Sequence, residues 1–166
     1  MNILIEEADL KNPEHGAAII ELLNAYAMDL QGYKRGLPEN VLQELIPEMM
    51  KIPTAMVFLA TADEKYVGMA ICFLGFSTFY ARPLINIHDF TVARDYRLRG
   101  IGRKLIQRIE EKAMDLNCCK LTLEVQEMNR NAINFYEDCG FEKCILDESE
   151  GRALFFLKYL DERRRV

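Results

Sequence analysis

The chain has 166 residues, half of them apolar and 28% charged, and 26 acidic against 21 basic side chains give it a formal net charge of −5. Domains usually hold about 100–200 residues, so we expect residues 1–166 to form one domain with its own core. This composition excludes the disordered, collagen-like and disulfide-stapled classes. No apolar run reaches the roughly 20 residues of a membrane span, and acidic residues interrupt the first ten positions where a secretory signal would be apolar. We therefore expect a cytoplasmic protein with no membrane partner.

Net acidity also disfavours nucleic acid as a partner, because nucleic-acid binders usually present a basic surface. The five cysteines include the adjacent pair Cys118 and Cys119 but form no C-x-x-C motif, so we expect most of them to be reduced thiols. We expect no metal site, because only His15 and His88 could supply imidazole ligands and no cysteine or histidine cluster lies near either.

The spacing of apolar residues and the helix and turn signals predict eleven elements. In chain order we expect a strand at residues 2–8, helices at 12–30 and 38–51, strands at 54–62, 66–77 and 84–93, a helix at 101–116, a strand at 120–126, a helix at 129–139, and strands at 141–146 and 154–159. Asn12 and Pro13 mark the first helix start, Pro47 interrupts the second helix, and Gly140 ends the last one. This order, β-α-α-β-β-β-α-β-α-β-β, predicts an α/β fold, a mixed sheet with helices on both faces.

The strand expected before the third helix changes the phase of its apolar residues. Ile85 and Ile87 share one face, whereas by strict alternation Phe90 belongs to the other. Two explanations fit: a β-bulge near His88 and Asp89, or a strand buried on both faces. A bulge would separate this strand from a neighbour and free backbone N–H groups to bind an extended ligand.

A basic, glycine-containing segment, RLRGIGRK, occupies residues 97–104. Four of its eight residues are basic in a chain that is acidic overall. The two glycines let the backbone approach a ligand closely, and the N–H groups and dipole of the following helix attract phosphate. We therefore interpret the segment as an anion-binding loop rather than a solvated turn. It matches neither G-x-x-x-x-G-K-[ST] nor G-x-G-x-x-G.

Two motifs make the chain resemble the GNAT superfamily of acyl-coenzyme A-dependent N-acyltransferases. R-x-x-G-x-G at residues 97–102 is similar to that family's pyrophosphate loop, and residues 129–141 match its second signature, N-x-x-A-x-x-x-Y-x-x-x-G-F. The element order matches over nearly the whole chain, which implies a mostly antiparallel GNAT-like sheet. A fainter likeness to the polyamine-acetylating branch covers residues 88–102 and 150–155. That branch is expected to have an acidic pair in place of His88 and Asp89, and a tryptophan near Arg152.

The resemblance implies acetyl-coenzyme A as cosubstrate and no metal. Asn129 would hydrogen-bond the cofactor, in addition to capping its own helix. The backbone of Phe90, Thr91 and Val92 would pair with the pantetheine arm. The pyrophosphate would be bound by loop N–H groups, with arginines as charge partners, through Arg97, Leu98, Arg99, Gly100, Ile101, Gly102 and Arg103.

Tyr136 matches the family's general acid, which protonates the departing thiolate. A phenol with a reference pKa of about 10 can protonate a thiolate whose conjugate acid has a pKa near 8.5. An alkylammonium of pKa about 10.4 is only ~0.04% neutral at pH 7, so the acceptor also needs a base or desolvation. His88, Asp89 and Glu124 are the candidates to bind the amine. The purely structural alternatives are a core tyrosine, a hydrogen-bonded strand histidine and a carboxylate that accepts loop N–H groups.

We therefore expect an N-acetyltransferase that acts on a primary amine of a small molecule by direct attack in a ternary complex. The alternatives are acetylation of a peptide or protein amine, and a catalytically silent coenzyme A-binding regulatory module. A nucleotide-dependent transferase is disfavoured, because the phosphate-lysine motif is missing. Members of the family often dimerise, so a homodimer is a further expectation.

Overall fold

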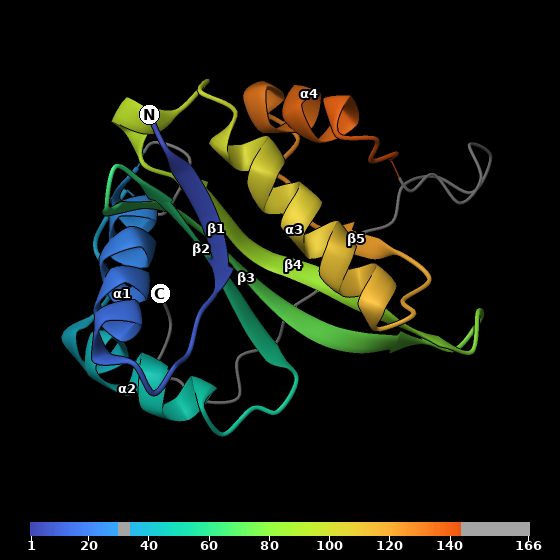
Figure 1. Ribbon diagram of the computed structural model, residues 1–166, viewed down its shortest axis with the longest axis horizontal. Helices are drawn as coiled ribbons and strands as arrows, with labels where there is room; N and C mark the ends of the chain where they lie inside the picture. The colour runs from blue at the N-terminus through green and yellow to red at the C-terminus, as the bar shows by residue number, and fades with distance from the viewer. Residues whose placement is uncertain (30–33, 144–166) are drawn as a thin grey trace.

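One five-stranded sheet forms the centre of the protein in the computed structural model, which describes residues 1–29 and 34–143 (Figure 1). The strands are β1 (Ile3–Glu7), β2 (Ala55–Ala62), β3 (Lys65–Ser77), β4 (Arg82–Val92) and β5 (Leu121–Leu123), and this chain order is also their order in the sheet. The first four strands pair antiparallel, and β5 pairs parallel with β4. The expected mixed, mostly antiparallel sheet is confirmed.

Helices cover both faces of this sheet, also as expected. They are α1 (Pro13–Met28), α2 (Glu39–Met49), α3 (Ile101–Asp115) and α4 (Arg130–Asp138), with a short 3-10 turn, η1 (Arg94–Tyr96), before α3. On one face, Ile19 of α1 and Met49 of α2 are buried against sheet residues such as Leu59. On the other face, α3 buries its apolar stripe against residues such as Phe58. Because helices cover both faces of the central strands, a ligand can reach these strands mainly at their ends.

The ends of α1 and α4 follow the capping signals in the sequence. The side chain of Asn12 accepts a hydrogen bond from the Glu14 N–H at 2.9 Å, and that of Asn129 accepts one from the Ala132 N–H at 3.2 Å. Gly140 has a φ of 88°, a left-handed conformation that favours glycine after a helix. Pro47 lies inside α2, which continues to Met49.

Two of the strand predictions differ from the structure. The strand expected at residues 120–126 ends at Leu123, so Glu124 lies beyond it and is exposed. The physical reason is that β5 pairs with β4 only as far as Ile87, next to an irregularity in β4. A strand was predicted at residues 141–146, but residues 141–143 do not form a strand. Its remainder, the turn at 147–152 and the strand at 154–159 lie outside the described residues, as does the expected last residue of the first helix.

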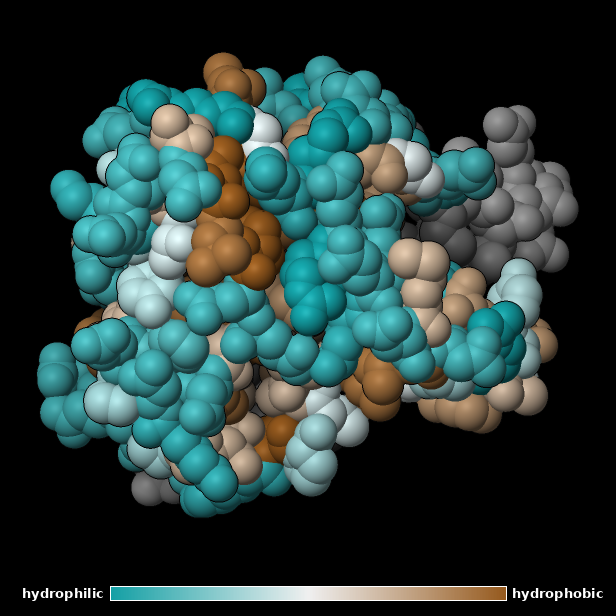
Figure 2. All heavy atoms as spheres, in the orientation of Figure 1, coloured by the Kyte–Doolittle hydropathy of each residue, from teal (hydrophilic) through white to brown (hydrophobic). Residues whose placement is uncertain are grey.

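The hairpin formed by β3 and β4 projects beyond the neighbouring strands (Figure 1). Its tip exposes three aromatic side chains, Phe76, Phe79 and Tyr80. Elsewhere, hydrophilic residues cover most of the face seen in Figure 2. Within residues 1–29 and 34–143, no helix is both long enough and apolar enough to span a bilayer.

Candidate functional site

A β-bulge at His88 opens the sheet. On β3, Ile71 pairs with Asp89 and the next residue, Cys72, pairs with Ile87, so His88 has no partner in the β3 register. This confirms the bulge that the apolar phase change indicated. Pairing of β4 with β5 stops at Ile87, whereas pairing of β4 with β3 continues to Val92. Beyond the bulge, residues 88–92 of β4 therefore have no paired strand on the β5 side among the residues that the structure describes.

The bulge presents an imidazole beside a carboxyl group. His88 is exposed, and its ring makes an edge-on contact with Phe73, with 5.6 Å between ring centroids. Phe73 packs with the core beneath α1 and α2, so His88 lies at that face of the sheet. Asp89 is partly buried, and burial raises the pKa of its carboxyl group while the nearby His88 opposes the rise.

The loop before α3 has a backbone that favours anions. Leu98 and Gly100 both adopt left-handed conformations, with φ values of 60° and 82°. Left-handed Gly100 is followed directly by Ile101, the first right-handed residue of α3, and a pair of residues of opposite hand turns successive N–H groups toward one point, an arrangement that binds anions. In addition, α3 starts after Gly100 without a side-chain cap, so the N–H groups of its first turn have no such partner. The Leu98 side chain is fully exposed, so packing of that side chain does not stabilise its left-handed backbone.

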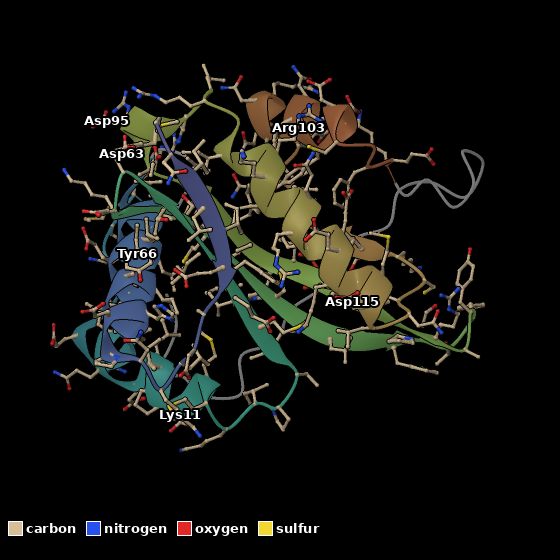
Figure 3. All side chains as sticks on the ribbon, in the orientation of Figure 1. Lys11, Asp63, Tyr66, Asp95, Arg103 and Asp115 are labelled. Carbon is tan, nitrogen blue, oxygen red and sulfur yellow. The ribbon has the colours of Figure 1, made fainter. Side chains whose placement is uncertain are left out.

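The cations of this loop have different surroundings. The Arg99 guanidinium lies over the ring of Tyr96, 5.6 Å from the centroid. Arg103 reaches toward α4, where its Nη1 donates to the Asp138 carbonyl at 3.0 Å (Figure 3). Lys104 is exposed on the first turn of α3. Arg99 and Lys104 therefore lie where they can attract phosphate, whereas Arg103 also joins two helices.

Arg97, at the start of the loop, is held by two protein groups. Its Nε donates to the Val92 carbonyl at 2.8 Å, and its Nη2 forms an ion pair with Asp29, the C-cap residue of α1. The Asp29 carboxylate is a partner that the sequence did not predict, and a contact between Arg97 and a phosphate stays a prediction.

Tyr136 lies in an aromatic cluster next to β4. Its ring contacts Phe90 edge-on at 6.0 Å, Phe135 at 5.3 Å and Phe141 at 5.7 Å, measured between centroids. Burial raises the pKa of the Tyr136 hydroxyl, and the nearby Tyr26 of α1 raises it further, so this phenol stays protonated at neutral pH. The sequence-predicted acid and the strand beyond the bulge are thus adjacent.

A cavity of about 310 Å³ lies between α1 and the end of β4. The described residues that line it are Leu22, Ala25, Tyr26, Met28, Asp29, Thr91, Ala93, Arg94 and Arg97. Sequence reasoning gave neither Tyr26 nor Asp29 a role in the site. No motif includes either residue, and their position on the last turns of α1 is the one signal that could have drawn attention to them. Ile133, the buried residue of α4, was also missed.

The structure also shows where the remaining predicted site residues lie. Asn129 caps α4, as expected, and a contact between Asn129 and a cofactor stays a prediction. Thr91 is buried, and Val92 already accepts the hydrogen bond from Arg97. Glu124 lies past the end of β5. Over the described ranges, no three His, Cys, Asp or Glu side chains come together to hold a metal ion.

Residues 18–141 match the model of the acetyltransferase (GNAT) family. The chain belongs to the GNAT acetyltransferase family.

A thialysine N-epsilon-acetyltransferase of Bos taurus is 35% identical over 89 residues, which cover 54% of this chain and 51% of that protein. A thialysine N-epsilon-acetyltransferase of Caenorhabditis elegans is 24% identical over 143 residues, 86% of each chain. The chain thus spans about half the length of mammalian relatives such as the Bos taurus protein. The structure of AAC(6')-Iy in complex with the bisubstrate analogue CoA-S-monomethyl-acetylneamine superimposes with a TM-score of 0.75 at 17% identity, covering 96% of this chain and 99% of that one. This likeness shows a shared fold.

Proposed function

We propose that this protein transfers the acetyl group of acetyl-coenzyme A to a primary amine on a small molecule. The observation that carries the proposal is that three features lie around the end of β4. They are the anion-binding loop before α3, the β4 backbone beyond the His88 bulge, and the Tyr136 phenol against Phe90. A ligand with a pyrophosphate, an extended amide-containing arm and a thioester needs these groups in this order.

Tyr136 and Asp89 suit a direct attack of the amine on the acetyl group. The neutral amine nitrogen forms a bond to the acetyl carbon, the carbon–sulfur bond breaks, and the thiolate takes the proton of the Tyr136 hydroxyl. The proton that the acylated nitrogen loses returns through water to the tyrosinate. Because burial raises the pKa of Tyr136, the phenol keeps its proton until the thiolate forms. Because burial also raises the pKa of Asp89, its carboxylate is a stronger base than an exposed one, and we assign it the ammonium proton, taken directly or through water.

The residues at the bulge support a small acceptor molecule of which one amine is recognised there. His88 and Asp89 supply one carboxylate there, where the polyamine-acetylating branch is expected to have two. The relatives named for thialysine support the side-chain amine of an amino acid as the acceptor. The screen that tests this measures thiol release with amino acids, simple amines, polyamines and peptides.

The donor is tested by thermal unfolding with coenzyme A or ATP. A ligand at 100 times its Kd stabilises the native state by about 2.7 kcal/mol, which raises the Tm of a chain of this size by about 5–10 °C. We expect this rise with coenzyme A and no comparable rise with ATP. A larger rise with ATP would refute the assignment and favour a nucleotide-dependent transferase.

Replacing the acid separates an enzyme from a silent cofactor-binding module. We expect Tyr136→Phe to lower kcat by about 10²–10⁴-fold, because the thiolate then leaves without a proton donor, while the Kd for coenzyme A stays unchanged. Tyr80→Phe, at the exposed hairpin tip, is the matched control and should keep full turnover. Equal turnover in all three proteins would remove Tyr136 from the mechanism.

A further inference from the structure

The ion pair between Arg97 and Asp29 joins segments that are 68 residues apart in the sequence. Asp29 ends α1, and Arg97 starts the anion-binding loop. The same guanidinium donates to the carbonyl of Val92, the last residue of β4. A planar guanidinium can hold two acceptors in fixed directions, which a lysine ammonium cannot do. Arg97 thus links the end of a helix, the end of a strand and the start of the loop.

This pair is partly shielded from water. The Asp29 side chain is 18% exposed and that of Arg97 is 39% exposed. Both line the cavity of about 310 Å³ that also contains Tyr26 and Thr91. Charge-assisted hydrogen bonds in such surroundings are stronger than those between fully exposed side chains.

The backbone immediately after Arg97 needs external support. Leu98 has a φ of 60°, a conformation that costs a non-glycine residue about 1–2 kcal/mol. Backbone of this kind persists only when its surroundings hold it in place. The Leu98 side chain is fully exposed and supplies no packing. Arg97, one residue earlier, makes two hydrogen-bonded side-chain contacts that can hold this backbone.

We propose that Arg97 is a positioning residue, which with Asp29 holds the loop so that the N–H groups of residues 98–102 are oriented for the pyrophosphate before coenzyme A arrives. This inference rests on the proposed function, since it takes coenzyme A as the ligand. The Nε and Nη2 groups of Arg97 already donate to Val92 and Asp29, so Arg97 is assigned to the shape of the loop rather than to the phosphates. The exposed cations Arg99 and Lys104 supply the attraction instead. A loop ordered in advance binds more tightly because less conformational freedom is lost on binding.

The direction in which Asp29→Ala changes the affinity for coenzyme A tests the proposal. If Arg97 were a phosphate ligand, Asp29→Ala would remove a negative charge near a polyanion and would tighten coenzyme A binding. With Arg97 as a positioning residue, Asp29→Ala weakens binding by about three- to tenfold, Arg97→Ala does the same, and the double variant is no weaker than the worse single one. The matched control is Asp95→Ala, which removes an exposed carboxylate of η1 close to the loop (Figure 3) and should leave the Kd unchanged or lower it.

A truncated donor excludes a general loss of structure. S-acetyl-pantetheine lacks the pyrophosphate, so Asp29→Ala should raise the KM for acetyl-coenzyme A and leave the KM for S-acetyl-pantetheine unchanged. If Asp29→Ala lowers the Tm strongly, Asp29→Asn, which keeps the shape and one acceptor oxygen, should show a smaller effect of the same sign. Tighter or unchanged coenzyme A binding by the Asp29 variants, additive effects, or equal KM changes for both donors would overturn the proposal. Failure of the unaltered protein to bind coenzyme A would instead overturn the proposed function.

Discussion

Asp89 illustrates how the site affects stability at the scale of one residue. Its carboxyl group is largely buried beside the bulge, and burial raises its pKa. Between the unfolded and the folded pKa, the folded state binds the proton more tightly. The free energy of unfolding therefore falls as the pH rises through this window and stays lower above it. A charged Asp89 opposes folding at neutral pH.

We therefore expect Asp89→Asn to raise the Tm at pH 7, by about 2–4 °C for each kcal/mol recovered, and to lower turnover because the proposed base is lost. The gain should shrink as the pH is lowered into the range where the unaltered Asp89 takes up its proton. Thermal unfolding of both proteins from pH 4 to pH 8 measures it. Asp95→Asn, an exposed carboxylate, is the control and should give no such trend. A Tm difference that is constant with pH would contradict the assignment of a destabilising charge.

At the scale of elements, the two glycines of the loop have different roles. Gly100 is left-handed, and a Cβ placed there would meet no atom within 4 Å. Gly102 is in α3, where a Cβ would lie 3.0 Å from Cζ of Phe135. Phe135 in turn contacts Tyr136 and Phe90. Gly100 thus serves the shape of the loop, whereas Gly102 lets α3 approach the aromatic cluster of α4.

Alanine substitutions should separate these roles. Gly100→Ala strains a left-handed residue by about 1–2 kcal/mol, and a loop that relaxes should bind coenzyme A more weakly while the chemical step changes little. Gly102→Ala gains helix propensity but overpacks the cluster at a cost of about 1–3 kcal/mol, and should lower kcat because the Tyr136 ring shifts. Steady-state kinetics and coenzyme A titration of both variants measure the two effects. The reverse assignment, with Gly102→Ala acting on affinity alone, would contradict the packing role.

How much the sequence could predict follows from which interactions are local. The bulge at His88 was one of two explanations that the sequence offered for the phase change in the apolar residues of that strand, and the register of β3 and β4 distinguishes them. The caps at Asn12 and Asn129 are also local signals. The ion pair of Arg97 with Asp29 could not be predicted, since it depends on how α1 lies across the sheet. The short β5 was missed for the same reason: the residues near Glu124 favour a strand, but the bulge in β4 removes the partner strand.

At the scale of the whole molecule, β5 is joined to β4 over a short length within residues 1–29 and 34–143. β5 pairs with β4 through three residue pairs, from Ile85–Leu121 to Ile87–Leu123, whereas β3 pairs with β4 along ten. Strands with few hydrogen-bonded neighbours open at lower free energy. A ligand that bridges β4 and the loop should therefore stabilise this part of the molecule most.

Hydrogen exchange measured by mass spectrometry tests this expectation. With coenzyme A at 100 times its Kd, exchange in peptides covering β5 and α4 should slow by up to about 100-fold, the limit set by binding to the closed state alone. Peptides from β1 serve as the internal control, since that strand lies at the opposite edge of the sheet, and they should change little. Uniform protection of both edges would show instead that the molecule opens only as a whole.

The short pairing of β5 with β4, three residue pairs long, also has a consequence for the order in which the acyl donor and the amine bind. The helix that follows β5 carries Tyr136, the proposed proton donor. We expect an acyl donor that contacts both β4 and the loop to order β5 and this helix before the amine binds. The steady-state rate law should then be ordered, with the acyl donor binding first and its spent thiol leaving last.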